Sequence, residues 1–121
     1  MGADVGDPRS DRTTLRRIAG VIALADGRAE EYLRLHREVW PEVLAALSRA
    51  NITNYSIYRH DGVLFSYLEH RGDDYEADMA SLAEDPATQR WWEVMTPMQR
   101  TLRATPDDPW WTELEEVFHL D

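Results

Sequence analysis

Two residues able to do chemistry, Tyr32 and His36, stand four positions apart in the sequence. They lie in a run whose apolar residues recur at spacings of three and four, which predicts a helix with both side chains on its buried face. The imidazole of histidine titrates near neutral pH and can accept or donate a proton. His36 is therefore either a core residue with a satisfied hydrogen bond or a proton-transfer group in a closed pocket, and position alone favours the core interpretation.

Polar aromatic residues elsewhere in the chain are candidates to share a pocket with this pair. Tyr55 lies in a predicted strand, and Trp91 and Trp92 lie on a predicted helix. Neighbouring helix positions point about 100° apart, so one indole fills the core and the other can line a cavity. A pocket of Trp and Tyr with hydroxyl and imidazole groups suits a sugar ring, which has apolar C–H faces and a polar rim. The same aromatics also suit a simple core.

The composition excludes several other kinds of chemistry. The chain has no cysteine, which removes disulfides, thiolate metal sites and thiol catalysis, and no lysine, which removes Schiff-base catalysis. A net charge of −10 without a basic stripe argues against nucleic-acid binding. The other histidines show no metal-ligand spacing, so we predict no metal site and interpret them as surface or strand-end residues: His60, His70 and His119.

The length of 121 residues suits one domain with a substantial core. No run of apolar residues is long enough to span a membrane. Residues 1–14 are polar and lack the apolar centre of a secretory signal peptide, so we expect a disordered leader followed by a single α+β domain over residues 15–121. A cytoplasmic location is the corresponding expectation.

Turn and breaker residues divide the domain into strands and helices. A helix is predicted over residues 28–49, with a kink or restart at Pro41, because proline disfavours helix at the residue before it. Strands are predicted over residues 15–25, 52–60, 63–70 and 114–120. Two further helices are predicted to begin at acidic caps, which are Asp73 or Asp74, and Asp85 before Pro86.

The order β-α-β-β-α-β, with the second helical stretch broken in two, is that of a ferredoxin-like α+β sandwich. In the central hairpin, alternation places Tyr55 and Ile57 on one face and Ile52 and Tyr58 on the other. Both faces of the sheet are then apolar, whereas the helices of this topology cover only one. We therefore predict a homodimer in which two sheets pack face to face, as in a dimeric α/β barrel.

The chain resembles the L-rhamnose mutarotase family over nearly all of residues 18–120. The segments that carry the resemblance are Glu31-Tyr32, His36, Trp40-Pro41-Glu42, Asn54-Tyr55-Ser56-Ile57-Tyr58, Gln89-Arg90-Trp91-Trp92, Met95 and Glu113-Leu114-Glu115-Glu116-Val117-Phe118. Each is weak alone, but their order and spacing together are specific.

The resemblance implies a small dimeric α+β protein that interconverts the α and β anomers of L-rhamnose or a related 6-deoxy sugar, without cofactor or metal. Carried over by motif, His36 would be the catalytic proton donor, and Tyr32 and Tyr55 would contact the sugar hydroxyls. Trp91 with Trp92 would complete the binding pocket. The chemistry agrees, because ring opening moves one proton onto the ring oxygen and another off the anomeric hydroxyl, and imidazole can serve in either role.

Two features depart from the family pattern. The leader has no counterpart, and Trp110-Trp111 stands where the family usually has small or polar residues, so indoles that reach the pocket would change its shape. Two alternatives stay open beside the mutarotase. One is a cofactor-free or haem-linked monooxygenase, which shares only the fold of face-to-face ferredoxin-like dimers. The other is a dimer that binds sugar without catalysing its conversion.

Overall fold

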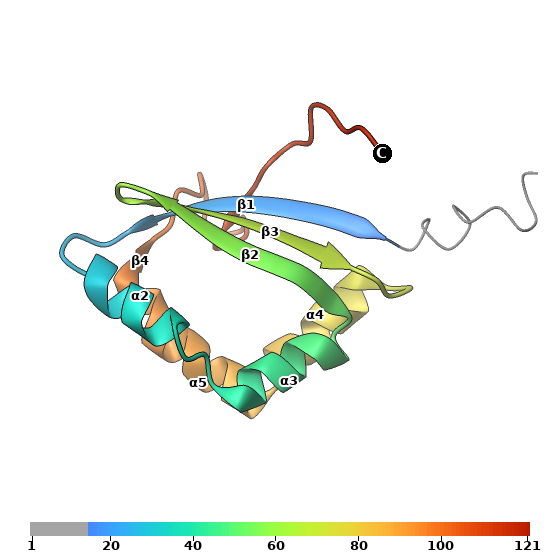
Figure 1. Ribbon diagram of the computed structural model, residues 1–121, viewed down its shortest axis with the longest axis horizontal. Helices are drawn as coiled ribbons and strands as arrows, with labels where there is room; N and C mark the ends of the chain where they lie inside the picture. Colours follow the sequence, from blue (N-terminus) through green and yellow to red (C-terminus); the bar gives the residue numbers. More distant parts are fainter. Residues whose placement is uncertain (1–14) are drawn as a thin grey trace, which may run out of the picture.

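The computed structural model describes residues 15–121, in which one antiparallel sheet carries a layer of helices on a single face (Figure 1). The strands follow the order β2-β3-β1-β4, with β5 also paired to β1, which is the strand order of a ferredoxin-like sandwich. The strands are β1 (Arg16–Leu24), β2 (Ile52–His60), β3 (Val63–His70), β4 (Gln99–Arg100) and β5 (Thr112–Glu113). The predicted leader lies outside the described residues.

The helices lie below the sheet in Figure 1. They are α2 (Ala29–His36), α3 (Pro41–Arg49), α4 (Tyr75–Ala83) and α5 (Pro86–Met95), and a short 3-10 turn, η1 (Thr96–Met98), leads into β4. None of the helices within residues 15–121 has the length and apolar character needed to cross a membrane.

Proline and aspartate set the helix boundaries as the sequence predicts. Pro41 is the first residue of α3, so the predicted long helix is two helices with a restart at the proline. Asp74 caps α4 by accepting a 3.0 Å hydrogen bond from the Ala77 amide. Asp85 caps α5 in the same way, with the Thr88 amide at 2.9 Å and Pro86 in the first turn.

The last predicted strand is wrong. Residues 114–120 form no strand. Pairing at this edge of the sheet is limited to two short ladders with β1: β4 pairs with Ala23 and Leu24, and β5 pairs with Gly20 and Val21. One backbone hydrogen bond, 2.8 Å from the Leu114 amide to the Ala19 carbonyl, extends the β5 pairing before the chain leaves the sheet. Alternating apolar residues favour a strand, but a strand also needs a neighbouring backbone to bond.

A bulge changes the predicted faces of β2. The pairing with β3 shifts between Thr53 and Ser56, and Asn54 adopts a left-handed φ of 47°. Ile52 therefore lies opposite the buried His70 and belongs to the helix-covered face, not to the face of Tyr58 as simple alternation predicts. Because the bulge adds one residue to β2, Tyr58 lies on the opposite, uncovered face from Ile52, and it pairs there with Phe65.

Two apolar clusters fill the space between sheet and helices. The first cluster includes Ile22, Leu24, Tyr32, Trp91 and Met98, which come from β1, α2, α5 and η1. The second cluster consists of Ala46, Ala50, Ile52 and Leu82, with partly buried Leu47, Leu68 and Met79 against it. The candidate site belongs to the first cluster.

Candidate active site

His36 sits at the end of α2 in contact with two aromatic rings. Its ring stacks on Tyr32 with centroids 4.3 Å apart, and the edge of Trp91 meets it at 5.3 Å. Trp40, in the break before α3, packs edge-on against the other side of this arrangement, 5.0 Å from Trp91. The helix restart at Pro41 thus places one more indole against Trp91, which itself contacts the predicted catalytic residue.

The hydrogen bond of His36 fixes its tautomer. The Nδ1 atom lies 2.8 Å from the Tyr32 carbonyl oxygen, which can only accept, so Nδ1 carries the proton. In the neutral ring the lone pair then belongs to Nε2. Burial lowers the pKa of His36 below its ordinary value, and the bond to the Tyr32 carbonyl opposes this only in part. The resting imidazole is therefore neutral at physiological pH, with Nε2 as a proton acceptor.

Tyr32 is the most enclosed polar residue of the site, with 2% of its surface exposed. Burial raises the pKa of its hydroxyl, and a hydrogen bond from Gln99 counteracts part of that rise. The Gln99 amide nitrogen lies 3.2 Å from the hydroxyl oxygen, and the Gln99 carbonyl oxygen accepts from the Trp110 indole at 2.8 Å. Pairing of β4 with β1 places Gln99 opposite Leu24, directly beside the first cluster.

Tyr55 points from β2 toward the same layer. Its neighbour Ser56 pairs with Tyr67 on the uncovered face, so Tyr55 projects on the helix-covered face. The residue keeps 42% of its surface exposed, yet burial of its hydroxyl end, with smaller contributions from Tyr32 and then Tyr75, raises the pKa of Tyr55 to about 12. Tyr55 is a neutral phenol on the side of the sheet that carries His36.

The two neighbouring tryptophans of α5 have different surroundings, as their spacing predicts. Trp91 is buried against His36 and Trp40, whereas Trp92 is 43% exposed. Within residues 15–121, Trp92 shares none of the ring contacts that join His36, Tyr32 and Trp91. The structure thus assembles four of the five residues expected at the site on one side of the sheet, and it leaves Trp92 at the surface.

The other histidines lie apart from this cluster. Of the two interpretations offered for His70, the strand-end one holds, since His70 ends β3, where it is buried and bonds to Asp78. His60, at the end of β2, and His119, in the C-terminal segment, are exposed. Within the described part of the chain, no group of three or more His, Asp or Glu side chains is arranged to hold a metal ion.

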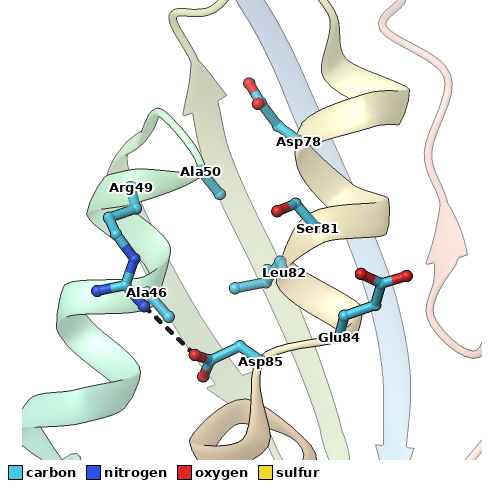
Figure 2. Close-up of a pocket in the computed structure, with 8 residues that line it drawn as sticks. All are labelled: Ala46, Arg49, Ala50, Asp78, Ser81, Leu82, Glu84 and Asp85. Atoms are coloured by element: carbon cyan, nitrogen blue, oxygen red, sulfur yellow. Dashed lines mark hydrogen bonds and ion pairs between the residues drawn. The ribbon is translucent and has the colours of Figure 1, made fainter.

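A groove of about 340 Å³ lies elsewhere, between α3 and α4 (Figure 2). Apolar Ala46, Ala50 and Leu82 form its floor, and Arg49 reaches across it to Asp85 at 3.3 Å. No imidazole or aromatic ring lines this groove. Since sugar chemistry needs a proton-transfer group and benefits from an aromatic surface, the His36 cluster is the better candidate.

Comparison with known proteins identifies the family of the chain. The sequence profile of a family described as L-rhamnose mutarotase matches residues 17–120. The chain belongs to the L-rhamnose mutarotase family. An L-rhamnose mutarotase of Lactiplantibacillus plantarum is 38% identical over 107 residues, which cover 87% of this chain and 98% of the relative. One from Acidiphilium cryptum is 39% identical over 109 residues, covering 88% and 99%.

A solved structure shows the same fold. The crystal structure of an L-rhamnose mutarotase from Formosa agariphila superposes with a TM-score of 0.70 at 28% identity, covering 88% of this chain and 99% of that chain. The membership confirms the mutarotase function expected from the sequence, and the protein is a carbohydrate isomerase that interconverts anomers.

Two residues at the site carry no role in the sequence-based prediction. Gln99 has no signal of its own, because it follows a helix end and its position depends on a two-residue ladder. Trp110 is noticed in the sequence as a departure from the mutarotase pattern, but only the fold brings its indole to Gln99. A long-range hydrogen bond of this kind has no local sequence pattern.

Proposed function

We propose that the His36 cluster is the active site and that it interconverts the α and β anomers of L-rhamnose or a related 6-deoxy sugar. Neutral His36 accepts the anomeric hydroxyl proton at Nε2 as the ring opens, while the ring oxygen takes a proton from a second donor. The aldehyde end then rotates, and as the ring closes the imidazolium returns its proton to the carbonyl oxygen while the C5 hydroxyl returns its proton to the second donor. His36 is thus the proton donor of the closing step.

One observation carries this assignment more than any other. The Nδ1 proton of His36 is engaged by the Tyr32 carbonyl at 2.8 Å, so the lone pair of Nε2 is the reactive position. The lowered pKa of His36, caused chiefly by burial, keeps that lone pair available at neutral pH. Stacking on Tyr32 and contact with Trp91 hold the ring in one orientation.

Tyr32, Tyr55, Trp91 and Trp92 complete the proposed site as substrate-binding residues. Trp91 presents an aromatic surface beside the imidazole, which suits the C–H face of a sugar. Tyr32 and Tyr55 supply neutral hydroxyls, because burial raises the pKa of both. Trp92 is exposed and would reach the sugar from the entrance of the site.

The deciding experiment is saturation-transfer NMR on equilibrated L-rhamnose with wild type and His36→Ala. General acid–base catalysis typically contributes roughly 10² to 10⁴ in rate, so the variant should lose acceleration of that order while keeping its folded circular dichroism spectrum. If wild type accelerates exchange in no 6-deoxy sugar, the proposed function is wrong. An active variant would remove only the role of His36, and sugar binding without acceleration would identify a binding protein.

We also infer that a second copy of the chain covers the uncovered face of the sheet. On this face Tyr58 is 64% exposed and Phe65, its cross-strand partner, is 39% exposed. The C-terminal segment rises on the same side of the sheet, away from the helices, and presents Val117 and Phe118 to solvent (Figure 1). Exposed apolar surface of this kind is typical of an interface between subunits.

Sedimentation equilibrium tests the dimer directly. Wild type should sediment as a dimer, and Phe65→Glu should sediment as a monomer, because it places a charge at the centre of the proposed interface. Leu44→Glu is the matched control, since Leu44 is also exposed but lies on α3. A wild-type monomer at every concentration would contradict the dimer. The cytoplasmic location expected from the sequence stays a prediction.

A further inference from the structure

A hydrogen-bonded relay connects the loop before β5 to the hydroxyl of Tyr32. The Trp110 indole nitrogen donates to the Gln99 side-chain oxygen at 2.8 Å, and the Gln99 amide nitrogen lies 3.2 Å from the Tyr32 oxygen. These three residues come from the loop before β5, from β4 and from α2, so only the folded chain brings them together. The relay ends at the residue that stacks on His36.

Donor and acceptor chemistry gives this relay one direction. An indole N–H can only donate, so the group of Gln99 that faces Trp110 must be its carbonyl oxygen. The NH₂ group of Gln99 is thereby turned toward Tyr32, and it can only donate as well. The Tyr32 oxygen therefore accepts, and its own proton must be directed to some other group. Trp110 thus determines, through Gln99, how the Tyr32 hydroxyl is oriented.

The loop holds Trp110 firmly in place. The Thr101 hydroxyl donates a 2.6 Å hydrogen bond to the Trp110 carbonyl, and the Arg103 guanidinium lies 5.2 Å from the centre of the indole ring. Arg103 also donates to the carbonyl oxygens of Pro106 at 3.1 Å and Asp108 at 3.3 Å, which ties both sides of the loop together. The indole is therefore fixed before substrate arrives.

We propose that Gln99 and Trp110 are positioning residues that make Tyr32 a hydrogen-bond donor toward the ring oxygen of the sugar. This inference rests on the proposed function. The ring oxygen is the one oxygen of a pyranose that carries no proton, so it can only accept, and it suits a hydroxyl whose lone pair is already engaged. A donor at this atom also assists ring opening, because the ring oxygen gains electron density as its bond to the anomeric carbon breaks.

The first test reverses the relay with Gln99→Glu. A glutamate at neutral pH has nearly the same shape but only accepts, so it takes the Trp110 proton with one oxygen and the Tyr32 proton with the other. The sugar ring oxygen then faces a lone pair. We expect kcat/KM for anomer exchange to fall roughly ten- to a hundred-fold. Full activity of Gln99→Glu would overturn the proposal.

Trp110→Phe tests the start of the relay with a matched control. It keeps an aromatic ring but removes the N–H, which frees the Gln99 amide to flip, and we expect a loss of roughly two- to tenfold. Trp111→Phe makes the same change one residue later, where the indole packs near Gly20 and not against Gln99. That control should stay within about twofold of wild type. Equal losses in the two variants would contradict a specific role for Trp110.

A binding measurement separates this inference from the activity itself. A carbasugar analogue of L-rhamnose, with CH₂ in place of the ring oxygen, keeps the hydroxyls but offers Tyr32 no acceptor. By calorimetry, wild type should bind the sugar roughly two- to tenfold more tightly than the analogue, and Gln99→Glu should bind both alike. The same preference in both proteins would overturn the inference while the proposed function stands. If wild type neither binds nor converts any of these sugars, the inference and the proposed function are both wrong.

Discussion

Two histidines each lie beside a tyrosine, one at the end of α2 and one at the end of β3, and the two pairs are built for different purposes. At the end of α2, His36 stacks on Tyr32 with ring centroids 4.3 Å apart, and at the end of β3, His70 meets the edge of Tyr75 at 5.2 Å. His70 is 1% exposed, and both of its ring nitrogens are engaged: Nε2 lies 2.7 Å from Asp78, and Nδ1 accepts from the Gly72 amide at 3.4 Å.

The difference lies in the second ring nitrogen. Within residues 15–121, His36 has one hydrogen bond, through Nδ1 to the Tyr32 carbonyl, and the ring is only half-buried. Asp78 bonds to His70 and also accepts from Asn51 at 2.9 Å, so that the end of β3, the turn before β2 and α4 are joined. A histidine with both nitrogens engaged inside the protein supports structure, whereas one with a remaining lone pair can exchange a proton with a ligand.

Removing the His70 ring should have the largest effect on stability. His70→Ala leaves a cavity under the sheet and takes a hydrogen bond from Asp78, so the free energy of unfolding should fall by roughly 2–5 kcal/mol. The exchange rate per folded molecule should remain near that of wild type. Denaturant titration and saturation-transfer NMR measure the two quantities.

His36→Ala is the matched control for this prediction. It removes the same type of side chain at the end of α2, and it should lower the rate far more than the stability. If His70→Ala abolishes exchange at unchanged stability, the assignment of the two histidines is reversed.

Gly72 should tolerate no side chain beside the His70 pair. A Cβ at this position would lie 2.6 Å from the Asp78 carboxylate, 2.7 Å from the Asn51 amide and 2.9 Å from His70 Cε1. Gly72→Ala should therefore cost about 1–3 kcal/mol of stability by forcing these groups apart. Gly62→Ala is the control, because nothing lies within 4 Å of the added carbon. Equal melting temperatures for the two variants would contradict the crowded geometry.

The sequence predicts those parts of the fold that depend on local chemistry. The helix restart at Pro41 and the caps at Asp74 and Asp85 are confirmed because each depends on residues within one turn of helix. The placement of Tyr32 and His36 together was also predictable, since periodicity puts both side chains on the inner face, but the spacing of Trp91 and Trp92 left open which indole would join them.

Long-range geometry limits the rest of the prediction. The bulge at Asn54 moves Ile52 to the other face, and a simple alternation of strand residues does not reveal such an insertion. The segment 114–120 alternates like a strand but has too few neighbouring backbone groups to bond within its own chain. Gln99 is part of the site only because a two-residue ladder places it beside Leu24.

The two histidine regions should also respond to pH in different windows. Burial lowers the pKa of His36 from 6.5, so the catalytic base is lost only when pH falls below that reduced value. Below it the exchange rate should fall by about tenfold per pH unit, since the unprotonated fraction does so. A rate profile over roughly pH 4 to 8, corrected for the uncatalysed reaction, measures this limb, and His70→Ala should leave its position unchanged.

The stability change linked to His36 has a defined sign. Between pH 6.5 and the reduced pKa of His36, the unfolded chain binds a proton that the folded chain does not. Stability therefore falls as pH falls through this window, and His36→Ala should remove that contribution.

The contribution of Asp78 to stability changes at lower pH. Its pKa is held below 3.8 by hydrogen bonds from Asn51 and then His70, so its stabilisation is full above 3.8 and is lost as pH falls through the reduced value. If the rate limb moved with His70→Ala, the two regions would be coupled and the separation of roles would fail.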